Sequence, residues 1–241
     1  MVGLGTIVNV GGIVVGGVGG LLFGKLMNEK LQDTLLKACG ISVLFIALAG
    51  VMDGMLSFDG TDIVSGRSML VIGCIILGAL IGEIINLEKW FESFGEWLKV
   101  KTGNAKDGGF VNGFVTASLT VCIGAMAVVG SIQDGIFGDS STLVTKAILD
   151  LIIVMVMTAS MGKGCIFSAI PVGIFQGLIT LLAKLIKPIM TDEAMGNLSL
   201  IGSVLIFCVG LNIIWGKKIK VANFLPSIVL AVAVAFLPLN I

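Results

Sequence analysis

Long apolar stretches alternate with short polar or charged segments along the whole chain. A membrane-spanning helix needs about 20 mainly apolar residues. Eight stretches are close to this length, and they cover residues 2–24, 35–55, 68–86, 109–131, 143–161, 164–186, 197–215 and 221–239. The pattern predicts an all-α polytopic membrane helix bundle of about eight spans, folded as a single transmembrane domain over residues 1–241.

The segment 87–100 has a different pattern. Its large apolar residues recur at helical spacing, and its charged residues lie on the opposite face. The apolar set is Leu87, Trp90, Phe91, Phe94, Trp97 and Leu98, and the charged set is Glu88, Lys89, Glu92, Glu96 and Lys99. This pattern predicts an amphipathic helix in the membrane surface, with its aromatic residues at headgroup level.

The first predicted span carries four glycines at four-residue spacing, Gly12, Gly16, Gly20 and Gly24, and residues 1–24 contain no charge. Residues four apart share one face of a helix, so this row forms a flat groove that another helix can approach closely. We therefore expect a glycine zipper that places the first helix at the centre of the bundle.

The order of the spans indicates an internal repeat. Spans one to three are echoed by spans six to eight, and at an offset of 161 residues Ser42-Val43-Leu44 matches Ser203-Val204-Leu205. Identity over the whole offset is no higher than chance for two apolar sequences. Because the second unit starts five spans later, it would be inverted in the membrane, as in many transporters. The candidate units are residues 1–86 and 164–241.

Composition supports the membrane assignment and removes several kinds of chemistry. The chain is 56% hydrophobic and 12% charged, with 15 basic residues, 15 acidic residues and no histidine. A net charge of zero argues against nucleic-acid binding, and the missing imidazole removes histidine catalysis and ligation. We expect no enzyme activity, no catalytic residue, no metal site and no nucleic-acid partner. The five scattered cysteines are typical of reduced packing residues.

Basic residues favour cytoplasmic loops, so their distribution predicts orientation. Eleven lie on the side opposite the N-terminus, namely Lys25, Lys30, Lys37, Lys89, Lys99, Lys101, Lys106, Lys163, Lys217, Lys218 and Lys220. Four lie on the N-terminal side, namely Arg67, Lys146, Lys184 and Lys187. We expect a multi-pass protein of the bacterial cytoplasmic (inner) membrane, with both termini outside and the 87–100 helix cytoplasmic.

The segment 130–141 combines polar side chains with glycines. Helical character is expected to end at Gly130-Ser131, and Asp134-Gly135 is a turn signal. Non-helical backbone at membrane depth is tolerated only where it lines protein or a water-filled cavity. The side chains that could bind Na⁺ or a proton-coupled cation are Ser131, Gln133, Asp134, Asp139 and Ser140. An ordinary extracellular loop explains the same residues equally well.

Polar residues within the predicted spans offer further candidates. Asn9 could face a pore or substrate, or bond a neighbouring helix. Ser168 lies near Pro171, where a kinked or broken helix would free backbone carbonyls toward a site. Asp150 follows Lys146 by four residues, which predicts an ordinary intrahelical ion pair near a helix end.

Two motifs carry a family resemblance. The run GAMAVVGSIQDGIFGD at residues 124–139 and the opening GTIVNVGGIVVGGVGG at residues 5–20 resemble the bacterial YqgA/YdfK family of multi-span membrane proteins. This domain-of-unknown-function resemblance covers the whole chain and implies a small inner-membrane protein, with no established substrate. The positions that match the strongest motif are Gly124, Met126, Gly130, Ser131, Gln133, Asp134, Gly135, Gly138 and Asp139.

These features favour a secondary transporter or ion-coupled carrier of a small solute. Its coupling ion would be Na⁺ or H⁺, with no other cofactor, and its partners would be membrane lipids and the small solute or ion. A passive channel would use the same polar elements without a coupled ion. A membrane scaffold or regulator would need only close helix packing. Assembly into a homo-oligomer stays open.

Overall fold

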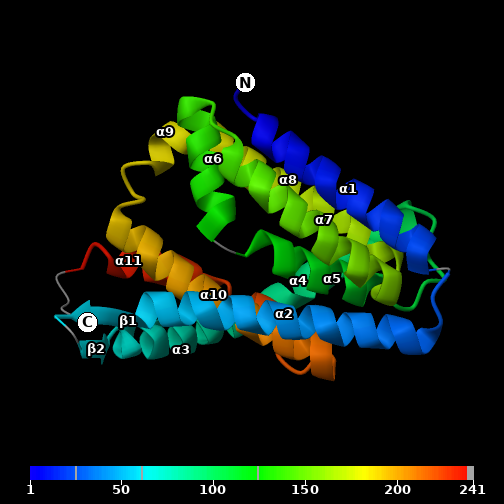
Figure 1. Ribbon diagram of the computed structural model, residues 1–241, viewed down its shortest axis with the longest axis horizontal. Coiled ribbons are helices and arrows are strands. Elements are labelled where there is room, and N and C mark those ends of the chain that lie inside the picture. Colours follow the sequence, from blue (N-terminus) through cyan, green and yellow to red (C-terminus); the bar gives the residue numbers. More distant parts are fainter. Residues whose placement is uncertain (25, 61, 124, 238–241) are drawn as a thin grey trace.

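The computed structural model describes residues 1–24, 26–60, 62–123 and 125–237 (Figure 1). Lys25, Gly124 and positions 238–241, which enter the predictions above, lie outside these residues. The elements are α1 (Leu4–Gly24), α2 (Glu29–Met55), β1 (Leu56–Asp59), β2 (Asp62–Ser65), α3 (Ser68–Ile85), α4 (Leu87–Lys101), α5 (Phe110–Cys122), α6 (Ala125–Phe137), α7 (Ser141–Met161), η1 (Lys163–Ser168), α8 (Ala169–Leu181), α9 (Ala183–Ile186), α10 (Asp192–Trp215), η2 (Val221–Phe224) and α11 (Pro226–Val234). The predicted all-α polytopic bundle is confirmed.

Within the described ranges, six helices are long and apolar enough to cross a membrane, and they are α1, α2, α3, α7, η1 joined to α8, and α10. The pair α5 and α6 would add a seventh span, although the two helices are bent by 61°. The predicted eighth span corresponds to η2 and α11, which cover Val221–Val234 and fall short of the ~20 residues of a full span. By length alone, the described residues therefore do not reach the expected eight spans.

The break in the fourth predicted span lies earlier than expected. α5 ends at Cys122, whereas α6 continues as regular helix through Gly130 and Ser131 to Phe137. The prediction that helical character ends at Gly130-Ser131 is therefore wrong. The Ser131 hydroxyl donates to the Ala127 carbonyl at 2.6 Å, a bond that a helix interior accommodates. Packing compensates the roughly 1 kcal/mol that a glycine costs in a helix, because Gly130 contacts α7.

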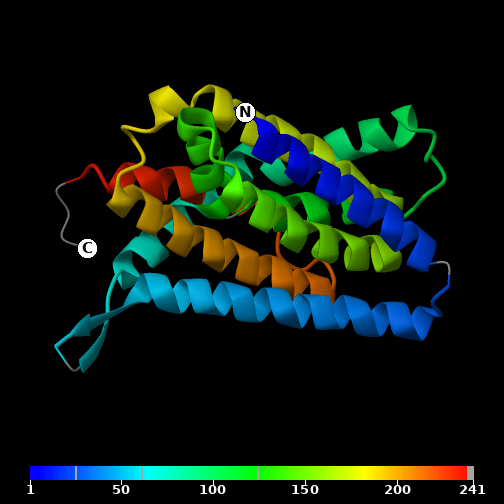
Figure 2. The same ribbon diagram turned by 45° about the horizontal axis from the view of Figure 1, so that its top comes forward.

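A short antiparallel hairpin joins α2 to α3. Leu56 pairs with Ser65 and Ser57 pairs with Val64, and β2 is exposed along its length. The hairpin replaces the polar loop expected between the second and third spans. Figure 2 shows it projecting beyond the end of α2.

The glycine row of α1 faces α7. Cβ atoms built on Gly12, Gly16, Gly20 and Gly24 would lie closer than 3.0 Å to the carbonyl oxygens of Ala147, Leu151, Met155 and Ala159. The constant offset of these contacts means that α1 and α7 run parallel, side by side in both views (Figures 1 and 2). Only a residue without a side chain permits this approach, so the row sets the distance between the two helices.

Three other helix pairs pack antiparallel. α2 lies against α10, where Gly40 meets Ile213 and Ile214 and Gly54 meets Leu200. α3 lies against η2 and α11, where Gly78 meets Ser227 and Gly82 meets Asn223. α1 lies against η1 and α8, where Gly17 meets Ile166 and Val10 meets Gly173. These pairs bring the first third of the chain onto its last third.

α4 is helical as predicted, and its aromatic residues are exposed. Trp90 is 68% exposed and Trp97 is 54% exposed, with Trp97 stacked on Phe94. Glu88, predicted on the solvated face, is instead buried at 5% exposure. Tertiary packing causes this burial. η2 packs against α4, and the Ala222 N–H of η2 donates a hydrogen bond to the Glu88 carboxylate.

Candidate functional site

A buried ion pair lies within the membrane-spanning helix α7. Lys146 Nζ is 2.5 Å from Asp150 Oδ2, and the two side chains are only 8% and 5% exposed. The predicted intrahelical pair is confirmed, and Lys146 lies in the second turn of α7, but the burial of both side chains was not predicted. Asp150 lies near the middle of the 21-residue helix Ser141–Met161, with the pair turned toward the protein interior.

The protein supplies only some of the hydrogen-bond partners that the two charged groups could take. A lysine ammonium has three donors and a carboxylate has about four acceptor positions. In the described part of the chain, Lys146 Nζ donates only to Asp150. Removing two charges from water costs several kcal/mol per ion, which a single contact compensates poorly. Such an arrangement in a membrane span is typical of a functional site.

Two buried amide side chains lie on the neighbouring helices α1 and α8. Asn9 on α1 and Gln176 on α8 are both 0% exposed. Among the described residues, neither the oxygen nor the nitrogen of either amide has a hydrogen-bond partner. The Asn9 side chain approaches Asp150. Buried polar groups are nearly always hydrogen-bonded in folded proteins, so these amides are positioned to bind a polar ligand.

Helix register places further polar groups at the same end of the bundle. Gly173 faces Val10, so Gln176, one turn farther along antiparallel α8, lies level with the α1 turn that precedes Asn9. The buried hydroxyls of Thr6 on α1 and Thr180 on α8 also have no partner among the described residues. We call Thr6, Asn9, Lys146, Asp150, Gln176 and Thr180 the core polar cluster.

Asp134 borders this cluster and has a defined partner. It is 0% exposed, and its Oδ2 accepts a hydrogen bond from the Gly5 backbone N–H at 3.0 Å. Gly5 lies in the first turn of α1, where backbone N–H groups lack helical partners and the helix dipole favours a negative charge. Asp134, predicted as an ion ligand, therefore caps α1 from α6. Its Oδ1 has no partner in the described residues.

The other predicted ligands of the 130–141 segment point to different partners. Gln133 Oε1 accepts from the Thr142 hydroxyl at 2.7 Å, and Ser140 is half-buried directly before α7. Asp139 is exposed and accepts from the Ser141 N–H at 3.0 Å, a bond that lowers the pKa of this carboxyl. The structure does not gather the five side chains, because α6 stays helical and the chain turns only at Gly138, where φ is +67°. No group of three or more Asp, Glu and Cys suited to a metal occurs in the described ranges.

Ser168 and Pro171 mark a change of helix type. Ser168 is buried, and its hydroxyl donates to the Cys165 carbonyl at 2.7 Å. Pro171 lies in the first turn of α8, where proline is tolerated, directly after the 3₁₀ segment η1. The predicted kink is therefore a 3₁₀-to-α transition, and the Ser168 hydroxyl is used locally.

A large apolar cavity lies outside the core polar cluster. It has a volume of about 530 Å³ and is lined by Trp90, Phe91, Phe94, Cys122, Ile123, Val128, Pro171, Ile174, Phe175, Leu178, Leu198, Gly202, Leu225, Ile228 and Val229. Its walls carry no charged side chain, so it offers no ligand that would compensate the cost of desolvating an ion.

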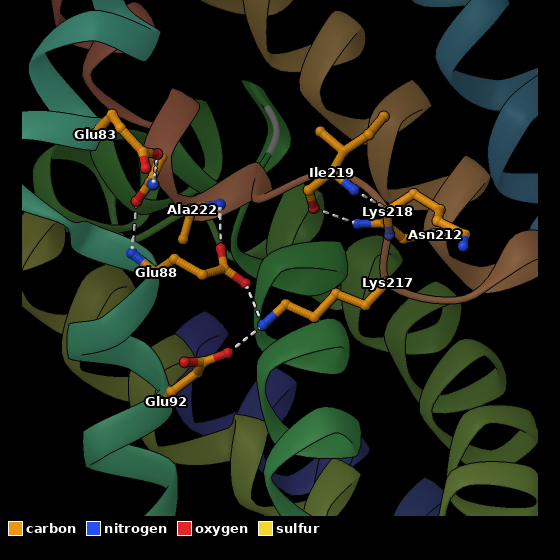
Figure 3. A network of polar contacts seen from close by, with 9 residues as sticks. Glu83, Glu88, Glu92, Asn212, Lys217, Lys218, Ile219 and Ala222 are labelled. Carbon is orange, nitrogen blue, oxygen red and sulfur yellow. Dashed lines mark hydrogen bonds and ion pairs between the residues drawn. The ribbon is translucent and has the colours of Figure 1, made fainter.

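A second set of buried charges lies where α4 meets the connection between α10 and α11 (Figure 3). Glu88 accepts from the Ala222 N–H at 3.1 Å, and its other oxygen lies 2.7 Å from Lys217 Nζ. Lys217 also pairs with Glu92, and Asn223 accepts from the Glu88 N–H at 2.7 Å. We call Glu88, Glu92, Lys217 and Asn223 the α4–η2 clamp. Burial alone would lower the pKa of Lys217, but its hydrogen bonds to both glutamates outweigh this effect and raise the pKa.

The comparisons with known proteins agree with this architecture. Residues 4–236 match the family described as a protein of unknown function, DUF554. The chain belongs to this family. It is 29% identical over 232 residues to the uncharacterized membrane protein YdfK of Bacillus subtilis (strain 168), covering 96% of this chain and 95% of the relative. It is 26% identical to the uncharacterized protein YqgA of Escherichia coli (strain K12), covering 95% and 94%. No solved structure matches.

The predicted family resemblance is thus confirmed, and the chain is a multi-helix membrane protein. From the sequence, the Lys146–Asp150 pair was interpreted as an ordinary intrahelical ion pair and not as a candidate site. Its signal was present, because two opposite charges one turn apart inside a span are costly unless they are buried together. Gln176 left a weaker signal as the only amide side chain of α8. The α4–η2 clamp had no local signal, because Glu88 and Lys217 are far apart in sequence.

Proposed function

We propose that this protein is an ion-coupled secondary transporter of a small solute and that the core polar cluster is its binding site. The Lys146–Asp150 pair, buried in the first half of an apolar span, carries this proposal. Ionisable residues inside membrane spans are costly and typically mark ion or substrate pathways. A scaffold would need the close α1–α7 packing of a glycine zipper, but it would not need these charges or unpartnered amides.

The three antiparallel contacts support an inverted repeat, a common architecture of secondary transporters. Under the proposed repeat, α1 corresponds to α8, α2 to α10, and α3 to α11. Each helix packs antiparallel against its counterpart. A two-fold axis in the membrane plane would produce this arrangement, because it inverts one unit and brings equivalent helices together. The hairpin β1–β2 would then be an insertion in the first unit.

The orientation in the inner membrane is part of the proposal. Lys146 lies in α7, not in a loop, which leaves Arg67, Lys184 and Lys187 on the N-terminal side. Ten lysines of the described residues lie on the other side. This bias favours both termini outside and α4 cytoplasmic.

Cysteine labelling of intact cells tests this orientation at two exposed positions. An impermeant thiol reagent should label Ser65→Cys in the hairpin and should leave Lys101→Cys at the end of α4 unlabelled. The unaltered protein, whose five cysteines are buried or half-buried, is the background control. The reverse labelling pattern would refute the proposed orientation.

Ion-dependent stabilisation tests the site itself. An ion that binds only the folded protein stabilises it by about 2.7 kcal/mol at a hundred times its Kd. Thermal melts of purified protein across Na⁺, K⁺, Li⁺ and pH should show stabilisation that Asp150→Asn removes. Asp134→Asn is the matched control for a neighbouring carboxylate that caps α1, and its ion response should persist with a lower baseline. If neither ions nor pH shift the melt of the unaltered protein, the scaffold interpretation takes precedence.

Reconstitution separates a carrier from a channel. In liposomes, a carrier should show saturable flux and should accumulate a substrate or proton against its gradient when the coupling ion gradient is imposed. A passive channel would allow only downhill flux through the same polar residues. Flux that never opposes a gradient would therefore favour the channel alternative.

A further inference from the structure

We propose that the apolar cavity between α4, α8 and α10 binds one acyl chain of a membrane phospholipid. This inference goes beyond the proposed transport function, because no residue of the core polar cluster lines the cavity in the described part of the chain. Its structural basis is an apolar space of about 530 Å³ that begins at exposed faces of the helices and reaches the buried interior of the bundle.

The cavity lies at the break between α5 and α6. Cys122 and Ile123 line it on one side of the break, and Val128 lines it on the other. A straight span would pack along its neighbours for its whole length. Because α5 and α6 are bent by 61°, a gap remains beside α8 and α10 that no described side chain fills.

The lining residues range from exposed to buried. Trp90 on α4, Leu178 on α8 and Val229 on α11 are 68%, 52% and 70% exposed, and we call these three residues the mouth. Val128 on α6 and Leu198 on α10 are only 6% and 4% exposed, and we call them the floor. α8, joined to η1, is long and apolar enough to cross a membrane, so its exposed side chains face lipid tails. A tail can therefore enter the mouth without passing through water.

The chemistry of the walls selects an apolar occupant. The described lining side chains are aliphatic or aromatic, apart from the Cys122 thiol, and none is charged. Such walls give water almost no hydrogen-bond partner, and apolar cavities of this kind stay dry. An empty cavity would forfeit the dispersion contacts of its walls. A lipid tail supplies these contacts, and the surrounding membrane provides tails at high concentration.

The size of the cavity fits one tail and not a helix of a second chain. An α-helix with its side chains is about 10 Å wide or more, so two turns of it occupy on the order of 850 Å³. This volume exceeds that of the whole cavity. A methylene group is close in size to a water molecule, about 30 Å³, so the cavity of about 530 Å³ holds roughly 17 of them. That number corresponds to one acyl chain of ordinary length.

The position of α4 favours a phospholipid as the source of the tail. α4 contributes Trp90, Phe91 and Phe94 to the cavity, and its amphipathic pattern is typical of a helix at headgroup level. A tail that enters beside α4 and extends to the floor would leave its glycerol and headgroup beside the charged face of α4. The polar and apolar ends of a phospholipid both match this arrangement.

Photo-crosslinking in a bilayer tests the proposal. The full chain is reconstituted into vesicles of phosphatidylethanolamine and phosphatidylglycerol that contain phosphatidylglycerol with a diazirine at the end of one acyl chain. Irradiation should attach this lipid to Val128 or Leu198, as mapped by mass spectrometry of peptides. Lipids around the protein reach exposed residues such as Ile76 of α3, so crosslinking at Ile76 is the internal standard.

Two variants at the cavity and one control sharpen the test. Leu178→Trp and Ile174→Trp each place a large side chain at an exposed lining position, and both should remove most of the crosslinking at the floor. Leu181→Trp is the matched control on the same helix, because Leu181 is exposed and does not line the cavity. Its crosslinking at the floor should equal that of the unaltered protein. The melting temperature and the Ile76 crosslinking report whether each variant is folded.

The outcomes decide the assignment. Crosslinking at the floor that is lost in Leu178→Trp and retained in Leu181→Trp would support the acyl-chain site. Crosslinking of the unaltered protein at exposed residues alone would overturn it, and so would full crosslinking at the floor in both cavity variants. A dimer that joins two chains through the mouth residues would assign the cavity to a second copy and would also overturn it. Each of these results leaves the transport proposal to its own tests, ion-dependent stabilisation and flux.

Discussion

The core polar cluster and the α4–η2 clamp both bury charge, yet they do so in different ways. In the clamp, Glu88 accepts from a backbone N–H and a lysine, and Lys217 has a second carboxylate in reach. In the core cluster, Lys146 and Asp150 have mainly each other, and the amides beside them have no partner in the described residues.

The difference lies in how fully each charge is compensated. A satisfied polar network holds a structure in one arrangement, whereas a partly satisfied one is costly and persists where function requires it. Lys217 is also 35% exposed, so water shares in its solvation, while Lys146 is almost fully enclosed. We infer that the clamp fixes η2 to α4 and that the core cluster is the functional site.

The largest expected effect comes from breaking the core pair. Asp150→Leu should destabilise the protein by about 3–5 kcal/mol, because it leaves the Lys146 charge buried without a partner. Lys146→Met/Asp150→Leu should recover most of this loss, because apolar replacements remove both desolvation costs. Thermal unfolding in one detergent measures all three proteins. Equal losses in the single and double variants would mean that the pair is not electrostatically coupled.

A comparably large effect is expected where α1 holds the core cluster against α7. Gly16→Leu should destabilise by about 1–3 kcal/mol or more, because its Cβ would meet the Leu151 backbone. Gly11 lies on the same helix with nothing within 4 Å, so Gly11→Leu is the matched control and should change stability little. Melting temperature and yield in detergent report the outcome. An unchanged Gly16→Leu protein would mean that the glycine row does not pack against α7.

A smaller effect is expected in the clamp. Glu88→Gln keeps an oxygen for the Ala222 N–H and removes only the charge opposite Lys217, which retains Glu92. Because Lys217 is partly exposed, the cost should be about 1 kcal/mol. Ion-dependent stabilisation should not change in this variant. A loss of ion response would mean that the clamp belongs to the transport site.

The smallest expected effect is the pH dependence of the clamp. The pKa of Lys217 is raised by its glutamate partners despite burial, and the pKa of Lys220 is raised by Glu83. Their contributions are complete below the ordinary lysine value of about 10.4 and disappear only as pH rises through the raised pKa. Between about pH 6 and pH 9 the clamp should therefore contribute a constant amount.

The pKa of Asp139 lies below this pH window. Its pKa is lowered by Ser141, so its contribution is complete above the ordinary aspartate value of about 3.9 and is lost as pH falls through the lowered pKa. Melts of the unaltered protein across this window, at constant salt concentration, measure these contributions. A melting temperature that changes across the window would assign the pH dependence to another group.

Much of the fold could be read from local patterns. The apolar lengths predicted the bundle, and the helical spacing of aromatic residues predicted α4. The glycine spacing predicted a close helix contact, although the identity of α7 as the neighbour had no local signal. The break after Cys122 and the hairpin β1–β2 were not predicted. Gly130 stays helical because it packs against α7, and the hairpin depends on pairing between two strands, so neither feature has a local signal.

Local sequence patterns are enough to identify a helical membrane protein, because hydrophobic length and period are properties of neighbouring residues. The family follows from the motifs and from the match over residues 4–236. Which polar residues lie together depends on the tertiary packing. Asp134 reaches α1 across 129 positions, and Asn9 approaches Asp150 from another helix, while Asp139, only five residues from Asp134, lies in solvent. Burial and partner choice depend on how distant helices pack, so the candidate site emerged only when α1, α6, α7 and α8 were assembled.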